Sequence, residues 1–177
     1  MKQTTVYLGL GSNQGEREMY LSLAVRKMGD LSGNSVVGMS GMMETQPLGV
    51  VGQEPYLNAV VKIRTGLSLL EMYEANRSIE RELGRVRAEH WGPRTIDIDL
   101  LLYDDRIFRS GALTIPHPQM HLRSFVLRPM CEIGADVVHP ILGKTMAELS
   151  TQEKNRYSHR SHALHNAVSI LIKMVNE

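Results

Sequence analysis

Cysteine is nearly absent from this chain of 177 residues, which contains Cys131 alone. A single cysteine excludes an intrachain disulfide framework and a zinc site built from several cysteines. Because Cys131 lies in an apolar stretch that we expect to be helical, we interpret it as a small core residue rather than a nucleophile. Long apolar runs are also missing, since the run near the end, Val168–Ile172, is far too short to cross a bilayer.

Charge of one sign and aromatic residues are scarce as well. The 20 lysines and arginines nearly cancel the 19 aspartates and glutamates, and aromatic residues make up 5% of the chain. A basic surface for nucleic acid or membrane is therefore not expected, and neither is an RNA-binding sheet, which needs strand-borne aromatics and a basic face. No long apolar run follows Met1, so we expect no signal peptide and predict a cytoplasmic protein.

Lysine is missing from one long segment, where the basic residues are arginines. Residues 63–143 contain no lysine, yet five arginines fall between positions 77 and 94: Arg77, Arg81, Arg85, Arg87 and Arg94. Arginine binds phosphate oxygens in pairs through its planar guanidinium, whereas lysine acts as a point charge. The pattern favours a phosphate-binding segment, although the interleaved glutamates would equally suit a salt-bridged helix surface around Arg77 and Arg81.

Short strands and helices alternate along the chain. Apolar spacing predicts strands over residues 6–11, 35–44, 56–63, 95–103 and 113–115, and helices over residues 17–28, 68–83 and 123–133. Capping boxes at Ser68 and Thr145 mark helix starts, and we expect the helix after residue 123 to be interrupted or bent near Pro129. The glycine- and proline-containing loops look too long for a tightly wound βαβ series. We therefore predict an α+β domain with a mainly antiparallel sheet and helices on its faces.

The strand over residues 95–103 carries the most informative motif, Asp97-Ile98-Asp99. Side chains alternate along a strand, so Asp97 and Asp99 project from one face. The opposite face, which should bury against a helix, holds Ile96, Ile98, Leu100 and Leu102. Two neighbouring carboxylates repel each other, and a divalent cation between them is the simplest remedy. Oxygen ligands favour Mg²⁺, which takes its remaining ligands from water and substrate phosphates.

An isolated Asp-x-Asp motif is weak evidence, because two surface aspartates paired with nearby arginines give the same pattern. Here Arg85, Arg87 and Arg94 come before the motif, and Trp91 offers a stacking face. Together these residues indicate metal-assisted phosphoryl transfer. A metal-dependent nucleotidyl- or glycosyltransferase is an alternative interpretation of the same motif.

Two further features flank this segment. The turn Gly9–Gly15 has its third glycine one place too late for a dinucleotide fingerprint, and no lysine follows it as a P-loop requires. We interpret its glycines as close-packing residues with a minor role in lining a pocket. His117, held between Pro116 and Pro118 in a segment six residues before Arg123, is a candidate phosphate donor.

Seven segments of the chain occur in a distinctive order: Gly9–Asn13, Thr45–Gly49, Tyr56–Ala59, Gly84–Arg87, Trp91–Asp99, Pro116–Met120 and Arg123–Phe125. In this order and with these gaps they closely resemble the 6-hydroxymethyl-7,8-dihydropterin pyrophosphokinase family of folate biosynthesis. The resemblance covers about residues 5–150, and the block Trp91–Asp99 is its most specific part.

The resemblance implies a ferredoxin-like α+β sandwich that transfers the β,γ-diphosphate of ATP to the hydroxymethyl group of the pterin and releases AMP. It implies that Asp97 and Asp99 hold two Mg²⁺ ions and that Arg85 and Arg94 assist transfer. Contacts with ATP are implied for Glu80, Arg87, Trp91, Arg94, Leu100, His117 and Arg123. The small-molecule partners would thus be ATP and a hydroxymethyl-dihydropterin, with no nucleic acid and no membrane.

The resemblance also implies where the pterin binds. The ring would lie between Tyr56 and Phe125, and its polar edge would meet Thr45, Gln46, Leu48 and Asn58. A flat heterocycle suits aromatic faces with a few fixed hydrogen-bond partners. These pterin-type residues count against the nucleotidyl- or glycosyltransferase alternative.

The chain departs from the family pattern at two positions and beyond residue 150. His90 stands where many members have arginine, so we expect no fixed positive charge there, and Arg77 stands where some have glutamine. We expect a pyrophosphokinase domain over residues 1–150. Residues 151–177 would form a helical extension that packs on the same domain or on a partner subunit. The protein would be a monomer or a weak homodimer.

Overall fold

The computed structural model describes residues 3–46, 54–85 and 94–155. Its centre is a five-stranded sheet with the strand order β2-β4-β1-β5, in which β3 also pairs with β4. All of these pairings are antiparallel. The strands are β1 (Thr4–Ser12), β2 (Asn34–Met39), β3 (Met43–Thr45), β4 (Tyr56–Thr65) and β5 (Asp97–Tyr103). A separate hairpin joins β6 (Phe108–Ser110) to β7 (Leu113–Ile115).

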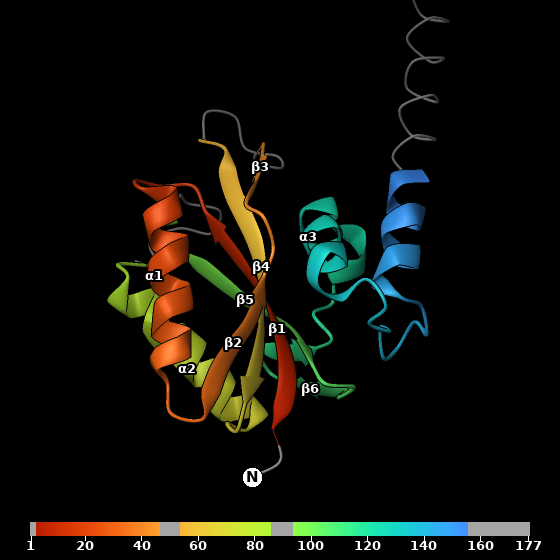
Figure 1. Cartoon of the computed structure of the whole chain (residues 1–177), viewed down its shortest axis with the longest axis horizontal. Coiled ribbons are helices and arrows are strands. Elements are labelled where there is room, and N and C mark those ends of the chain that lie inside the picture. Colours follow the sequence, from red (N-terminus) through yellow and green to blue (C-terminus); the bar gives the residue numbers. More distant parts are fainter. Residues whose placement is uncertain (1–2, 47–53, 86–93, 156–177) are drawn as a thin grey trace, which may run out of the picture.

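Helices cover both faces of the sheet. On one face lie α1 (Arg17–Asp30) and α2 (Leu69–Glu82), and on the other lies α3 (Ser124–Gly134), with a helix over residues 146–155 beyond it (Figure 1). The order β1-α1-β2-β4-α2-β5 around this sheet is the ferredoxin-like α+β arrangement, so the predicted fold is confirmed. Among the helices of the described ranges, none is long and apolar enough to cross a membrane.

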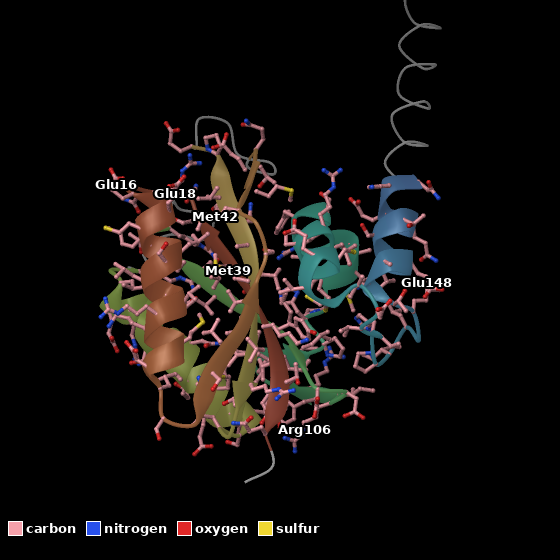
Figure 2. The ribbon with its side chains drawn as sticks, viewed as in Figure 1. Glu16, Glu18, Met39, Met42, Arg106 and Glu148 are labelled. Carbon is pink, nitrogen blue, oxygen red and sulfur yellow. The ribbon has the colours of Figure 1, made fainter. Side chains whose placement is uncertain are left out.

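Two predicted capping boxes start helices. Ser68 N–H donates to Glu71 Oε2 (2.7 Å) and Glu71 N–H to Ser68 Oγ (3.4 Å), which fixes the start of α2. The equivalent bonds between Thr145 and Glu148 measure 2.7 and 3.2 Å and start the helix over residues 146–155, on which Figure 2 labels Glu148. That helix runs across residue 150, and the predicted division of the chain at this residue stays a prediction.

Two apolar clusters stabilise the layers. The cluster under α1 and α2 includes Leu8 and Met72, and the cluster under α3 includes Leu127 and Met130. Side chains fill the space between the sheet and the helices on both sides (Figure 2). Cys131 packs, partly buried, against the second cluster, which confirms its interpretation as a packing residue. The helix α3 continues through Pro129.

Two strand predictions need correction. The expected single strand over residues 35–44 is two short strands, β2 and β3, because the Ser40 hydroxyl between them accepts the Val60 N–H (2.9 Å) of β4. In β5, the pairing with β1 shifts between Tyr7 and Leu8, which leaves Leu101 as an extra residue. Such a bulge reverses the alternation of faces, so Leu102 joins the cluster under α3 rather than the one that contains Ile98.

Candidate active site

A cavity of about 200 Å³ opens on the α3 side of the sheet. Gly9 and Gly11 of β1 form its floor, because glycine has no side chain to fill the space above this face of the sheet. A Cβ atom at Gly11 would lie 3.4 Å from Asn58 Oδ1. The cavity brings together most of the predicted site residues of the described ranges, namely Thr45, Gln46, Tyr56, Asn58, Arg94, Asp97, Asp99, Arg123 and Phe125.

The acidic pair faces this cavity as predicted. Asp97 lies opposite Gly11, and Asp99 lies opposite Gly9, in the β1–β5 register, so both carboxylates share the glycine face of the sheet. Their side chains are 22% and 44% exposed. The strand therefore presents two neighbouring carboxylates to the cavity, which is what a bound cation requires.

Arginines from three segments converge on these carboxylates. Arg85 Nη1 lies 2.6 Å from Asp97 Oδ1, and Arg94 binds the second oxygen of the same carboxylate. Arg123, at the start of α3, lies 3.9 Å from Asp99. Burial alone would lower the pKa of Arg94, but the charge of Asp97 raises it above its ordinary value. The site thus concentrates positive charge around a pair of acids.

Glu80 supports Arg85 from within the protein. Its side chain is only 6% exposed, and its Oε1 accepts both the Ile98 N–H (2.8 Å) and the Arg85 guanidinium. The Arg85 N–H donates to the Glu80 carbonyl at 3.0 Å. Burial raises the pKa of Glu80 above its ordinary value, and the hydrogen bond from the Ile98 N–H and the charge of Arg85 oppose this rise.

Arg85→Ala is expected to destabilise the protein as well as the site. Removing one partner leaves the Glu80 carboxylate buried without its counter-charge, which costs about 3 kcal/mol. Without Arg85 the folded-state pKa of Glu80 rises further, so the loss of stability should be larger at pH 8 than at pH 5. Urea unfolding at the two pH values measures this, with Arg26→Ala, an arginine 79% exposed on α1, as the control. Equal losses for the two variants would contradict the assigned role of Glu80.

Among the described residues of the site, Asp99 has the pKa that is raised most. Burial and the charge of Asp97 raise its pKa to about 6, against the opposing charge of Arg123. Because the folded protein binds this proton more tightly than the unfolded chain, the stability linked to Asp99 is fully present below about pH 4 and is lost as the pH rises through 6.

The metal-free protein should reveal this titration. At pH 4 Asp99 is protonated, and Asp99→Asn should unfold at nearly the wild-type temperature. At pH 7 the variant should be more stable than the wild type. A gain of roughly 1 kcal/mol after solvent screening corresponds to about 2–4 °C in a chain of this size. Thermal unfolding in EDTA across this range measures the difference. A difference that stays constant from pH 4 to pH 7 would show that Asp99 titrates normally.

The other end of the cavity is aromatic. Tyr56 at the start of β4 and Phe125 at the start of α3 both line it. Asn58 Nδ2 donates to Thr45 Oγ1 at 2.8 Å, which orients the amide with Oδ1 on the side of Gly11. Burial raises the pKa of Tyr56 above its ordinary value, against the opposing charge of Arg94. This end offers flat apolar surfaces and a fixed amide.

The His117 N–H donates to the Leu101 carbonyl of β5 at 2.9 Å, and His117 does not line the cavity. Burial and the charge of Arg123 lower its pKa to about 4, so the ring is neutral at physiological pH. Nδ1 accepts the Gln119 N–H at 3.2 Å, which places the ring proton on Nε2. A neutral Nε2–H donor beside Arg123 is compatible with the predicted contact to a phosphate.

The remaining predicted residues divide into two groups. Leu48, Arg87 and Trp91 lie outside the described residues. Glu80 and Leu100 lie away from the cavity: Glu80 lies behind Arg85, and the Leu100 side chain packs in the cluster under α1 and α2. Neither Glu80 nor Leu100 lines the cavity, and the assigned ATP contacts of these residues stay predictions.

Sequence reasoning underrated the glycines and missed Asn13. Gly9 and Gly11 line the cavity, which agrees with the expected role in lining a pocket, although we assigned them mainly to packing. Asn13, which was not assigned any role, contacts the backbone of Arg94. The signal for the glycines was their spacing of two on a strand, which places both on the face that carries the acidic pair on the neighbouring strand.

The donor set fits a magnesium ion that takes most of its ligands from elsewhere. Within the ranges 3–46, 54–85 and 94–155, no group of three or more His, Cys, Asp or Glu side chains forms a cage for a metal. Asp97 and Asp99 supply only two carboxylates to the cavity. Mg²⁺ is commonly held by one or two carboxylates together with waters and substrate phosphates.

Comparisons with known proteins identify the family of this chain. Residues 7–135 match the family of 7,8-dihydro-6-hydroxymethylpterin-pyrophosphokinase (HPPK). The chain is 43% identical over 136 residues to the 2-amino-4-hydroxy-6-hydroxymethyldihydropteridine pyrophosphokinase of Haemophilus influenzae, covering 77% of this chain and 85% of that protein. It is 43% identical over 131 residues to the protein of the same name from Bacillus subtilis, covering 74% and 78%.

Solved structures support the fold. A crystal structure of HPPK-DHPS in complex with substrates superposes with a TM-score of 0.72 at 12% identity, covering 91% of this chain and 45% of the other. Wild-type Plasmodium falciparum HPPK-DHPS with pteroate gives 0.71 at 15% identity, covering 93% and 44%. With the matched sequence, the shared fold and the acidic pair in its predicted place, this chain belongs to the 7,8-dihydro-6-hydroxymethylpterin-pyrophosphokinase family.

Proposed function

We propose that this chain transfers the β,γ-diphosphate of ATP to 6-hydroxymethyl-7,8-dihydropterin in folate biosynthesis, with Mg²⁺ bound at Asp97 and Asp99. One observation carries the proposal: the acidic pair, ringed by arginines, lies in the same cavity as the aromatic pair Tyr56 and Phe125. A polyphosphate site and a heterocycle site therefore adjoin, which suits transfer between a nucleotide and a pterin alcohol.

The pterin would bind at the aromatic end. The rings of Tyr56 and Phe125 supply faces for the flat heterocycle, and Asn58 Oδ1 accepts a hydrogen bond from its polar edge. Thr45 and Gln46 line the same end. Its hydroxymethyl group would then point toward Asp97 and Arg94.

The polyphosphate would bind at the acidic end. When bound, magnesium neutralises phosphate charge and draws the nucleotide to Asp97 and Asp99. In the structure, Arg85 and Arg94 already sit on the two oxygens of Asp97. These guanidiniums can turn from the carboxylate to the phosphates, because they need only exchange one set of anionic oxygens for another.

The reaction balances without a covalent enzyme intermediate. The pterin hydroxyl oxygen bonds to the β-phosphorus of ATP and loses its proton to solvent. The bond from the β-phosphorus to the oxygen shared with the α-phosphate breaks, and AMP leaves with that oxygen. The protein's contribution is positioning and charge. Arg94 and Arg85 stabilise negative charge that develops in the transition state, and the neutral Nε2–H of His117 donates a hydrogen bond to a phosphate oxygen.

The product of ATP consumption tests the proposal. With Mg²⁺ and 6-hydroxymethyl-7,8-dihydropterin, the protein should form AMP and the pterin diphosphate in equal amounts, followed by ³¹P NMR. Without the pterin, ATP should persist. Formation of ADP would indicate an ordinary kinase, and AMP formed equally fast without the pterin would indicate ATP hydrolysis.

Gly11→Val is expected to weaken pterin binding selectively. A branched side chain at Gly11 would project into the cavity between Asn58 and Tyr56, both within 4 Å of the position of its Cβ. The Kd for the pterin should rise at least about 30-fold, equivalent to roughly 2 kcal/mol, while ATP binding changes little.

Fluorescence titration with the pterin measures the Kd, and Gly38→Val is the matched control. Gly38 lies on β2, and a Cβ there would face Lys62 and Ile133 rather than the cavity. If both variants lose pterin affinity equally, the glycine floor is not the pterin site.

A further inference from the structure

Asn13 lies in the turn between β1 and α1 and holds the backbone of Arg94 at two points. The Asn13 N–H donates to the Arg94 carbonyl at 3.1 Å, and the Asn13 Oδ1 accepts the Arg94 N–H at 2.8 Å. Asn13 is only 2% exposed. The backbone position from which the Arg94 side chain reaches Asp97 is therefore set by a residue 81 positions earlier in the chain.

The Asn13 side chain also reaches the segment that leads into β4. Asn13 Nδ2 donates to the Glu54 carbonyl at 3.4 Å, two residues before Tyr56. Arg17, at the start of α1, reinforces this contact: its Nη1 donates to the Pro55 carbonyl at 2.6 Å, and its Nη2 pairs with Glu44 of β3 at 2.9 Å. Glu16 and Glu18 mark this end of α1 in Figure 2.

We propose that Asn13 is a positioning residue that sets the place of Arg94 relative to Tyr56. The proposal rests on the proposed function, in which Arg94 serves the phosphate end and Tyr56 the pterin end. A carboxamide suits the task because it accepts from Arg94 N–H with one atom and donates to Glu54 C=O with the other. Alanine lacks both side-chain contacts, and aspartate keeps only the acceptor.

Positioning of this kind acts on the rate of transfer. The two reactants meet between the ends of the cavity, and a displacement of about 1 Å from the productive geometry can cost roughly 10²-fold in rate. Asn13 does not itself line the cavity, but it hydrogen-bonds to Arg94, which does, and to the segment before β4, so we expect its effect on the rate to act through the position of Arg94.

Asn34 provides a matched control at the opposite end of the sheet. Its Nδ2 donates to the Met28 carbonyl at 3.0 Å and its Oδ1 accepts from the Thr65 hydroxyl, so it too joins two segments through one carboxamide. It does not line the cavity. Asn34→Ala should therefore cost stability without changing kcat, as a purely structural asparagine does.

The test combines kinetics with hydrogen exchange. Asn13→Ala should lower kcat about 10- to 100-fold at a temperature where it remains folded, while Asn34→Ala stays within about twofold. In an Arg94→Ala background, Asn13→Ala should add less than about threefold, because residues that act as a unit are not additive. Without substrates, the amide of Arg94 should exchange faster in Asn13→Ala than in Asn34→Ala.

Each outcome decides the proposal. An unchanged kcat in Asn13→Ala, a full additional loss in the Arg94→Ala background, or an Arg94 amide that keeps its protection would overturn it. If Asn13→Ala does not fold, Asn13→Asp replaces it and should lower kcat at least about threefold with the Arg94 amide still protected; an unchanged kcat again overturns it. A wild-type protein that forms no AMP would refute the proposed function, and the exchange comparison would still test the contact.

Discussion

Asp97→Asn is expected to lower kcat by about 10³-fold or more, because a bound metal contributes several kcal/mol of charge stabilisation and each 1.36 kcal/mol is tenfold in rate. The amide keeps the shape of the side chain but loses the charge that would attract the cation. The fold should persist, since Asp97 is a partly exposed residue at the start of β5 and Arg85 retains its pairing with Glu80. Asp97→Ala should behave in the same way.

Asp105→Asn makes the same change of charge just beyond β5, on an exposed residue. It should retain nearly wild-type kcat. AMP formation by both variants under saturating ATP and pterin is the measurement, with circular dichroism to compare their folds. Near-normal turnover by Asp97→Asn would remove the acidic pair from the mechanism.

Arg94→Ala is expected to lower kcat by about 10²- to 10³-fold, the range observed when one preorganised donor to a transition-state oxyanion is removed. The KM for ATP should change much less, because Arg85 and Arg123 still attract the phosphates. Stability should change little, since the carboxylate of Asp97 keeps Arg85 as a partner.

Arg94→Lys separates charge from geometry, since lysine keeps the charge but lacks the planar fork. It should recover only part of the lost kcat. Steady-state kinetics with both substrates varied gives the two constants, and Arg109→Ala on β6 controls for loss of one exposed arginine. A large rise in KM with an unchanged kcat would assign Arg94 to ground-state binding of ATP.

The order of apolar residues predicted most of the fold. The capping boxes at Ser68 and Thr145 predicted helix starts, and the alternation along residues 95–103 predicted that Asp97 and Asp99 share one face, as they do in the structure. Local rules succeeded here because each feature depends on neighbours within four residues. The antiparallel sheet followed from loops too long for tight βαβ crossovers.

Other features depend on partners far along the chain. The bulge at Leu101 arises where β5 pairs with β1, so a strand pattern alone assigned Leu102 to the wrong face. The break at Ser40 depends on Val60 of β4 in the same way. The contact of Asn13 with Arg94 spans 81 positions and leaves no periodic trace in the sequence.

The burial of Glu80 also escaped residue-level reasoning. On α2 it follows Ile79 and would ordinarily be expected at a solvated helix surface, yet it accepts the Ile98 N–H and supports Arg85. Its implied place in the site came from the family resemblance, not from spacing. Charged residues are rarely buried unless paired, so a sequence pattern gives such a position little support.

Binding of a non-hydrolysable ATP analogue, with and without Mg²⁺, tests the central claim most directly. Calorimetry of the wild-type protein should show at least about tenfold tighter binding with magnesium than in EDTA, a difference of roughly 1.4 kcal/mol. The double variant Asp97→Asn, Asp99→Asn should bind the analogue equally under both conditions. If the double variant keeps the full effect of magnesium, the cation is not held by these two carboxylates.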